Sequence, residues 1–329
     1  MNIWKILGLI LLIPLSYVVF CIVYAKLTYF DPPTVSTLYS NPSAPKVNQK
    51  EFTTMIWNIG YCGLGDKSDF FYDGGKMMRP AEGDLQIYFE GVMNELKDNM
   101  VDFAMLQEVD SHSKRSYYLD QVSFIRAQSH STNPFSHFAL NYKVNYIPQP
   151  WLEPMGKVNS GLLSMSIFQP SRVERHQLPG AFGFPKQLFF LRRCLLIFYI
   201  PLNNGKELVL INIHNSAYDD SGKLKKEEMN YLKNILKKES DKGNYIVCGG
   251  DWNQCPPDFK YNQLDAGKEG DYSQTNVEEL IKNGHWVYDK TTATNRKNDK
   301  PYSDKTFTTI IDFYWISDNI IPVECKGIK

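Results

Sequence analysis

The segment YIVCGGDWN, residues 245–253, decides how this chain is interpreted. Its first four residues are apolar, and a short apolar run that ends at a glycine pair predicts a buried strand. Asp251 and Asn253 follow directly, so a carboxylate and a carboxamide stand at the end of a rigid element. Fixed side-chain oxygens of this kind suit a hard cation such as Mg²⁺ and an attacking water. Alone, the pattern is equally typical of a glycine turn with a capping aspartate.

Other strand-like runs also carry polar residues at or near an end. The runs 53–58, 102–108, 207–214 and 311–316 carry, in that order, Asn58, Glu108, His214 and Asp312. A lone strand-end Glu is more often paired in an ordinary salt bridge, and a lone His is more often structural. The fixed order of these groups is what favours a common site over five unrelated ones.

The remaining periodicity predicts a layered α/β domain. Helices are expected over residues 84–98, with Asp84 as the N-cap, and over residues 117–128 and 223–240. Further strands are expected over residues 135–140, 161–168, 193–200, 286–288 and 305–309. Asn203-Asn204-Gly205 is a hairpin turn signal, so the sheets should be mixed and largely antiparallel.

The ordered set of motifs resembles the endonuclease/exonuclease/phosphatase superfamily, the DNase I-like metal-dependent phosphoesterases. The resemblance covers residues 51–329 and implies a four-layered α/β sandwich, in which two mixed, mostly antiparallel sheets are flanked by helices. It also implies an Mg²⁺- or Mn²⁺-dependent phosphoesterase that cleaves phosphodiester bonds by in-line attack of water.

The resemblance assigns a role to each site candidate. It makes Glu108 a metal ligand, with Asn58 beside it. Asp251 would orient or deprotonate the water, Asn253 would hold the water or the phosphate, and His214 would bond a phosphate oxygen in the transition state.

Three further assignments are weaker. Asp312 matches the residue that partners a second histidine. Asn159 stands where a phosphate-contacting Asn is expected, within about one residue of register. Arg115 follows the metal Glu and is a candidate for substrate phosphate, although a solvated charge is an equal alternative.

The second histidine belongs to a Ser-Asp-His motif towards the C-terminus, and the sequence reaches Lys329 without one. Ser317-Asp318-Asn319 lies too close to Asp312 to serve. We therefore expect that the chain as given lacks its last strand. The alternative is a catalytically inactive, membrane-tethered binding module of the same fold.

Residues 1–30 are expected to be a transmembrane anchor or a signal segment, because residues 6–25 carry no charge and are about long enough to span a bilayer. Lys5 before the run and Lys26 after it give a weak orientation signal that favours an extracytoplasmic domain. Secretion after cleavage near Ala25 is the alternative. Residues 31–50, which contain four prolines, are expected to be an extended linker.

The charge balance and the cysteine spacing argue against two classes of function. Lys+Arg and Asp+Glu both number 36, and this balance argues mildly against a nuclease with a basic groove, although nucleic acid stays possible. The six cysteines form no CxxC pair, which argues against a zinc site. The substrate is therefore left open between nucleic acid and a lipid or sugar phosphodiester, with the membrane as a partner through the N-terminal segment and no protein partner inferred.

Overall fold

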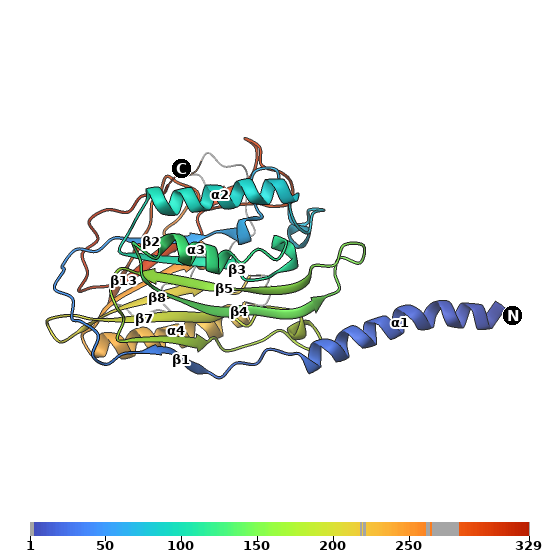
Figure 1. The fold of residues 1–329 in the computed structure, drawn as a ribbon, viewed down its shortest axis with the longest axis horizontal. Helices are drawn as coiled ribbons and strands as arrows, with labels where there is room; N and C mark the ends of the chain where they lie inside the picture. Colours follow the sequence, from blue (N-terminus) through green and yellow to red (C-terminus); the bar gives the residue numbers. More distant parts are fainter. Residues whose placement is uncertain (1–2, 218, 220–221, 261–263, 265–282, 329) are drawn as a thin grey trace.

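A computed structural model describes residues 3–217, 219, 222–260, 264 and 283–328. Two sheets pack face to face and helices cover both outer faces, which gives four layers (Figure 1). The predicted four-layered sandwich of mixed, mostly antiparallel sheets is confirmed.

The larger sheet has seven strands in the order β1-β6-β7-β8-β9-β13-β10. Their bounds are β1 Val35–Ser40, β6 Arg172–Gln177, β7 Cys194–Pro201, β8 Glu207–His214, β9 Tyr245–Asp251, β13 Asp312–Ser317 and β10 Gly284–Val287. Within it β8 and β9 are parallel, while β7 and β13 run antiparallel to them. The turn predicted at residues 203–205 connects β7 to β8.

The smaller sheet has the order β2-β3-β5-β4. Its strands are β2 Thr54–Asn58, β3 Phe103–Asp110, β5 Gly156–Ser166 and β4 Phe135–Ile147. β2 and β3 are parallel, and β5 is antiparallel to β3. A separate two-stranded ladder pairs β11 Asn295–Arg296 with β12 Thr308–Thr309.

Helices cover the outer faces of both sheets. α2 Glu82–Asp98 and α3 Gln121–Ser129 lie on the smaller sheet, and α4 Lys223–Asp241 lies on the larger one (Figure 1). Short 3₁₀ turns occur at η1 Gly60–Cys62, η2 Phe71–Asp73, η3 Lys114–Ser116 and η4 Lys186–Leu188. α4 begins and ends within a residue of its predicted bounds because its apolar positions repeat at helical spacing.

The core is divided by these layers. Between the two sheets lie Phe103, Met105, Leu196, Phe198 and Leu210, all buried. The inner faces of sheets bury apolar side chains from alternate positions, so a strand covered on both faces reads as a continuous apolar run. This is why β7 and β8 were recognisable in the sequence.

Two local predictions are wrong. The predicted linker over residues 31–50 is part of the fold: β1 pairs with β6 at the edge of the large sheet, and Val47 packs into the core between the sheets. Its prolines flank β1 rather than interrupt it, so they did not exclude a strand. Asp84 is not the N-cap of α2, because the helix begins two residues earlier at Glu82, and Asp84 instead binds Lys67.

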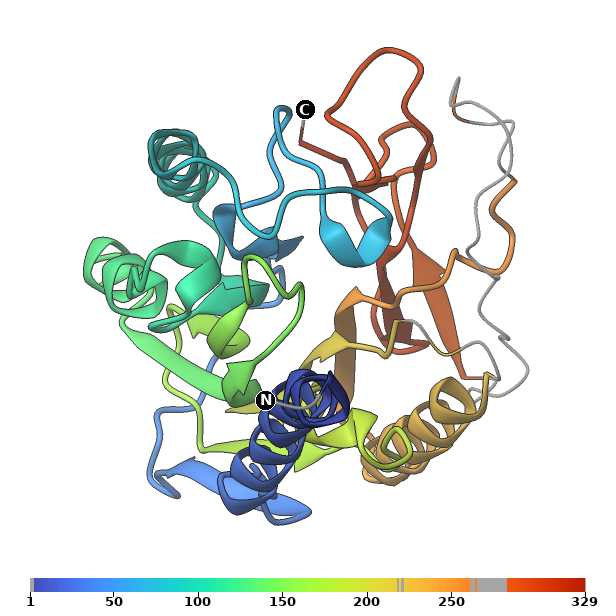
Figure 2. The same ribbon diagram turned by 90° about the vertical axis from the view of Figure 1, so that its right-hand side faces the viewer.

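The N-terminal helix α1, Ile3–Leu27, projects from one end of the sandwich (Figures 1 and 2). Within the part of the chain that the structure describes, no helix meets the length and apolarity needed to cross a membrane.

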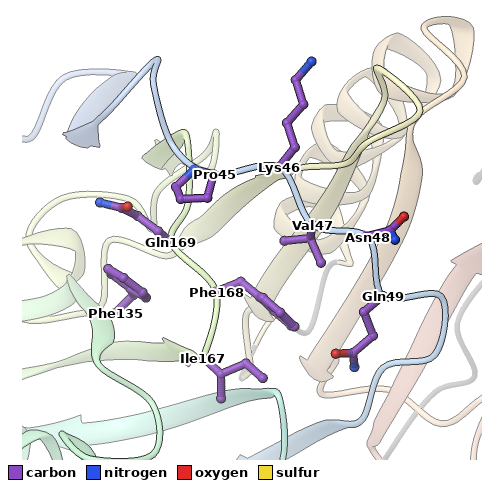
Figure 3. Close-up of a pocket in the computed structure, with 9 residues that line it drawn as sticks. All are labelled: Pro45, Lys46, Val47, Asn48, Gln49, Phe135, Ile167, Phe168 and Gln169. Carbon is purple, nitrogen blue, oxygen red and sulfur yellow. The ribbon is translucent and has the colours of Figure 1, made fainter.

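A shallow pocket lies at the end of the sandwich where β2 and β3 begin (Figure 3). It is lined by three apolar side chains, Phe135, Ile167 and Phe168, and by the segment 45–49. Asp102 stands at the same end and accepts hydrogen bonds from the backbone N and the hydroxyl of Thr53. This far end therefore holds no part of the predicted site.

Candidate functional site

Strand register brings the predicted residues to one end of the sandwich. His214, Asp251 and Asp312 are direct register partners on the neighbouring strands β8, β9 and β13. Asn58 ends β2, which packs against β9, and Glu108 lies near the end of the adjacent β3. Five groups that are up to 254 residues apart in sequence, from Asn58 to Asp312, therefore meet at one edge.

Asn58 joins the two sheets at this edge. Its amide Nδ2 donates to Asp251 Oδ2 over 2.7 Å and to Glu108 Oε1 over 3.3 Å. Its Oδ1 accepts from the backbone N of Gly60, which fixes the amide plane. A single carboxamide thus holds two carboxylates side by side, although both carry the same charge.

The backbone of β3 is distorted to present Glu108. The pairing of β3 with β5 shifts register between Leu106 and Val109, and Glu108 has φ of +54°. Bulges of this kind re-aim a side chain and are frequent beside active sites. Left-handed conformations in residues other than glycine cost free energy and cluster at functional positions. Asn253, with φ of +49°, is a second case in the same site.

The glycine pair before Asp251 is required by space. A Cβ on Gly250 would collide with the carbonyl oxygen of Ile213 on β8, and Gly250 has φ of +140°. A Cβ on Gly249 would come within 2.6 Å of the Tyr314 ring and 2.9 Å of Ile56. Close packing of β9 against β8, β13 and β2 therefore needs both glycines.

Below the carboxylates, a buried amide pair ties the sheets together. Gln107 Nε2 donates to Asn212 Oδ1 over 2.8 Å, and Asn212 Nδ2 donates to the carbonyl oxygen of Leu106 over 3.1 Å. Both side chains are fully buried in an otherwise apolar layer. Buried polar groups must find partners, and these two find each other only in one register of the two sheets.

His214 is buried at the floor of the site. Its Nε2 lies 3.4 Å from Asp251 Oδ2 and 3.9 Å from Glu108 Oε1. Burial, with the guanidinium groups of Arg193 and Arg115 nearby, holds its pKa well below 6.5. The imidazole is therefore neutral at neutral pH and can donate or accept a hydrogen bond.

Burial and neighbouring charge also act on the two aspartates. The pKa of Asp251 is raised to about 6, chiefly by burial, while the hydrogen bonds from Asn58 and from the backbone N of Asn253 oppose the rise. The pKa of Asp312 is raised well above 3.8 by burial and by the charge of Asp251. Such raised values beside a like charge mark a place where added positive charge is stabilising.

Arg193 is a member of this site that the sequence analysis missed. It is buried, and its positive charge adds to the lowering of the pKa of His214 and opposes the rise in the pKa of Asp251 and of Glu228. It directly precedes β7, which is antiparallel to β8, so the start of β7 lies at the same end as the last residue of β8. The available signal was a basic residue directly before an apolar run.

Arg115 and Asn159 lie beside this edge rather than within it. Arg115 donates from Nε and Nη2 to Asp110 over 3.0 and 2.9 Å, packs over the Tyr61 ring and lies 3.9 Å from Glu108. Asn159 ties β5 to Ser113 through its backbone, and its Oδ1 has no hydrogen-bond partner among the described residues. Their contact with substrate stays a prediction.

The side chains at this edge include oxygen donors for a divalent cation. Within the described ranges, no three His, Cys, Asp or Glu side chains are arranged as a ready-made chelating cluster. Mg²⁺ does not need one, because it is commonly held by one or two carboxylates together with waters and substrate phosphate. The carboxylates of Glu108 and Asp251, with Asp312 Oδ1 left without a hydrogen-bond partner in the described part of the chain, are hard oxygen donors that fit such an ion.

No family model matches the sequence, and no curated protein matches it. Solved structures do match. ANGEL2, a 2',3'-cyclic phosphatase in complex with adenosine-2',3'-vanadate, aligns with a TM-score of 0.50 at 14% identity, over 81% of this chain and 84% of that one.

The fold is DNase I-like. Truncated TDP2 from Caenorhabditis elegans aligns with a TM-score of 0.47 at 13% identity, over 80% of this chain and 82% of that one. An endonuclease/exonuclease/phosphatase protein from Beutenbergia cavernae DSM 12333 aligns with a TM-score of 0.47 at 16% identity, over 80% of this chain and 63% of that one. The structural likeness establishes the architecture, and the chemistry has to be argued from the residues.

Proposed function

We propose that the chain is a divalent-metal-dependent phosphoesterase that hydrolyses phosphodiester bonds by in-line attack of water. The observation that carries the proposal is the amide of Asn58, which donates to both Asp251 and Glu108. Two carboxylates held together beside a buried neutral histidine form a cluster that a structural role alone does not require. Positioning and charge neutralisation are most of what phosphoryl transfer needs from a protein.

Asp251 is the group that accepts the proton of the attacking water. With a pKa of about 6 it is ionised at neutral pH and still basic enough to take a proton. The bond from Asn58 fixes one carboxylate oxygen, and the backbone N of Asn253 binds the other over 2.8 Å. The carboxylate plane is therefore set before substrate binds, which lowers the cost of reaching the transition state.

Asn253 and His214 supply hydrogen bonds to the phosphoryl group. Asn253 Nδ2 donates to the carbonyl oxygen of Asn215, which orients its amide in the loop after β9. His214, neutral and buried, can donate to a phosphoryl oxygen without adding a charge of its own. Arg193, close to both His214 and Asp251, adds the positive charge that the reacting phosphate would meet.

Glu108, with Asn58 beside it, would hold Mg²⁺ or Mn²⁺. When bound, such an ion supplies charge neutralisation at the phosphoryl oxygens and at the leaving group. The likeness to ANGEL2, named as a 2',3'-cyclic phosphatase, supports a phosphoester substrate. Nucleic acid and a lipid or sugar phosphodiester both stay within the proposal.

The test uses the full chain with bis(p-nitrophenyl) phosphate and Mg²⁺. We expect hydrolysis that is lost on chelation, returns with Mg²⁺ or Mn²⁺, and falls by about 10³-fold or more in Asp251→Ala. Thermal unfolding of the variant, compared with the parent, separates lost chemistry from lost fold. Metal-independent turnover, or turnover retained in Asp251→Ala, would contradict the assignment.

A catalytically inactive binding module is the second candidate. The oxygen Oδ1 of Asp312, which has no hydrogen-bond partner among the described residues, would serve ion binding in this module as it would in the enzyme. A folded protein that binds Mg²⁺, shown by calorimetry, but hydrolyses none of DNA, RNA, phosphoinositides or sphingomyelin would decide for the module.

Attachment to a membrane through residues 1–30, with the domain outside the cytoplasm, stays part of the proposal, and secretion stays its alternative.

A further inference from the structure

α1 exposes an apolar surface over most of its circumference. Leu12, Ile13, Leu15, Val18, Val19, Phe20 and Val23 are all exposed, at nearly consecutive positions. A helix that packs on one protein partner shows a single apolar stripe, whereas one that is apolar all round is surrounded by protein core or by lipid. Because α1 projects away from the sandwich, this domain does not supply that core (Figure 1).

The other side of α1 is attached to the domain. Cys21 and Ala25 are buried, and the Tyr17 hydroxyl lies 2.8 Å from the hydroxyl of Tyr146 at the end of β4. The Tyr17 ring also contacts Trp151, with ring centroids 5.8 Å apart. The position of the helix relative to β4 is therefore fixed by packing.

The β4–β5 loop beside α1 is itself apolar and exposed. Trp151 is 60% exposed, and Leu152 is fully exposed at its tip. The turn η4 also contacts α1, and it is preceded by the exposed Phe184. Trp151 and Leu152 on one loop and Phe184 on another thus lie near an apolar helix, as aromatic residues do at the boundary of a bilayer.

The same loop lies at the end of the molecule that carries the candidate site. The start of β5 pairs with the end of β3, where Ser160 is opposite Asp110. Lys114 Nζ donates to the carbonyl oxygen of Pro154, and the adjacent Arg115 lies 3.9 Å from Glu108. The loop and the candidate site are therefore connected through η3, and Figure 2 views the molecule from this end.

We infer that α1, the β4–β5 loop and the segment at Phe184 form one lipid-binding surface, which holds the candidate site towards a bilayer. The occupant is lipid rather than a second protein because the exposed apolar side chains are not confined to one stripe of α1. Lys26 and Lys186, both exposed, stand at its margin, where basic side chains meet lipid headgroups. The inference rests on the membrane attachment proposed above, and because it concerns binding it stands or falls independently of hydrolysis.

The experiment places a fluorescent label on the surface of the full chain. Cys325→Ser removes the one cysteine of the six that is not buried, and Leu152→Cys or Phe184→Cys then takes an environment-sensitive label. Ile87→Cys on α2 is the matched control, because Ile87 is 61% exposed in the parent and Phe184 is 64% exposed. Each protein is reconstituted in phosphatidylcholine vesicles with and without bromine on the acyl chains.

We expect bromine to quench the labels at positions 152 and 184 by about half or more and to leave the label at 87 within error of the unbrominated sample. Equal quenching at all three positions, no quenching at 152, or recovery of the protein free of vesicles would overturn the inference. A blue shift at 152 that grows with protein concentration without bromine quenching would instead identify a second copy of the chain as the occupant. Unchanged circular dichroism confirms that each variant is folded.

Discussion

The carboxylates at the two ends of the sandwich differ in their hydrogen bonding and in how closely they are grouped. At the far end, Asp102 accepts from the Thr53 backbone N over 2.7 Å, from its hydroxyl over 3.1 Å and from Gln49 over 3.3 Å. At the site end, Asp251 and Asp312 face each other and Asp312 keeps an oxygen without a partner in the described residues. The neighbours of Asp102 bond its Oδ2, which is a structural role, whereas two buried acids placed side by side with one oxygen left unpaired are arranged for something that arrives later.

The backbone repeats this contrast. Glu108 and Asn253 adopt left-handed conformations at the site end, and the sheet pairing shifts register beside Glu108. At the far end, the β7–β8 connection is an ordinary turn with a glycine, Gly205, where φ is positive. Residues other than glycine therefore adopt strained, left-handed backbone conformations at the proposed site, whereas a glycine takes the positive φ where the chain only reverses direction.

The largest expected difference between the ends is in activity. Glu108→Gln should lower kcat/KM by about 10²-fold or more and raise the Mg²⁺ concentration needed for half-maximal rate, because it removes a charged oxygen donor. Asp102→Asn, its matched control, should leave both quantities within about twofold and lower the melting temperature instead. Equal losses of activity in the two variants would end the distinction between the ends.

The next effect is a pH dependence of stability. Glu228, on α4, is buried with both oxygens accepting from Ser216, and burial raises its pKa from 4.5 to about 7. The folded state therefore holds this proton more tightly than the unfolded chain does. The contribution is fully present below pH 4.5 and is lost as pH rises towards 7, by on the order of 3 kcal/mol.

Glu228→Gln should accordingly flatten the decline of unfolding free energy between pH 4.5 and 7 and raise stability at pH 7. The control is Glu239, the other buried acid of α4, which lies near the helix's far end and pairs with Lys242 over 2.8 Å. Glu239→Gln should lower stability at pH 7, because Lys242 loses its partner. Denaturant titrations across this pH range measure both, and equal signs would contradict the assignment.

The smallest effect separates two glycines with positive φ. Gly250→Ala should cost about 2 kcal/mol or more, because its Cβ meets the carbonyl oxygen of Ile213. Gly205→Ala, whose Cβ would meet nothing within 4 Å, should cost only about 1 kcal/mol from the backbone conformation. Guanidinium unfolding of the two variants gives the difference directly. Similar costs would show that close packing of β9 against β8 is not limiting.

The strands that are buried on both faces were the part of the fold that could be predicted from the sequence. β8 was predicted at its observed bounds, since its apolar run has a polar residue at each end. The order of the polar residues along the chain favoured a common site for Asn58, His214 and Asp251, and the parallel pairing of β8 with β9 places His214 beside Asp251. Residue order along the chain was therefore sufficient to find most of the edge.

What the sequence did not show depends on contacts between distant segments. β1 has mostly exposed side chains and is a strand because β6 offers it an edge, so its own residues carried little signal. The left-handed conformation of Glu108 comes from the register shift against β5, and the proximity of Arg193 comes from the antiparallel course of β7. None of these follows from local periodicity.

The integration of β1 into the large sheet restricts where the domain can work. Only residues 28–34 separate the end of α1 from β1, and Arg192 binds Asp31 within that stretch over 3.0 Å. A long flexible tether would let a catalytic head sweep a wide volume around its point of attachment. Here the short connection removes that freedom. Whatever α1 binds therefore also sets the distance and tilt of the domain relative to it, and more distant molecules must diffuse to the domain.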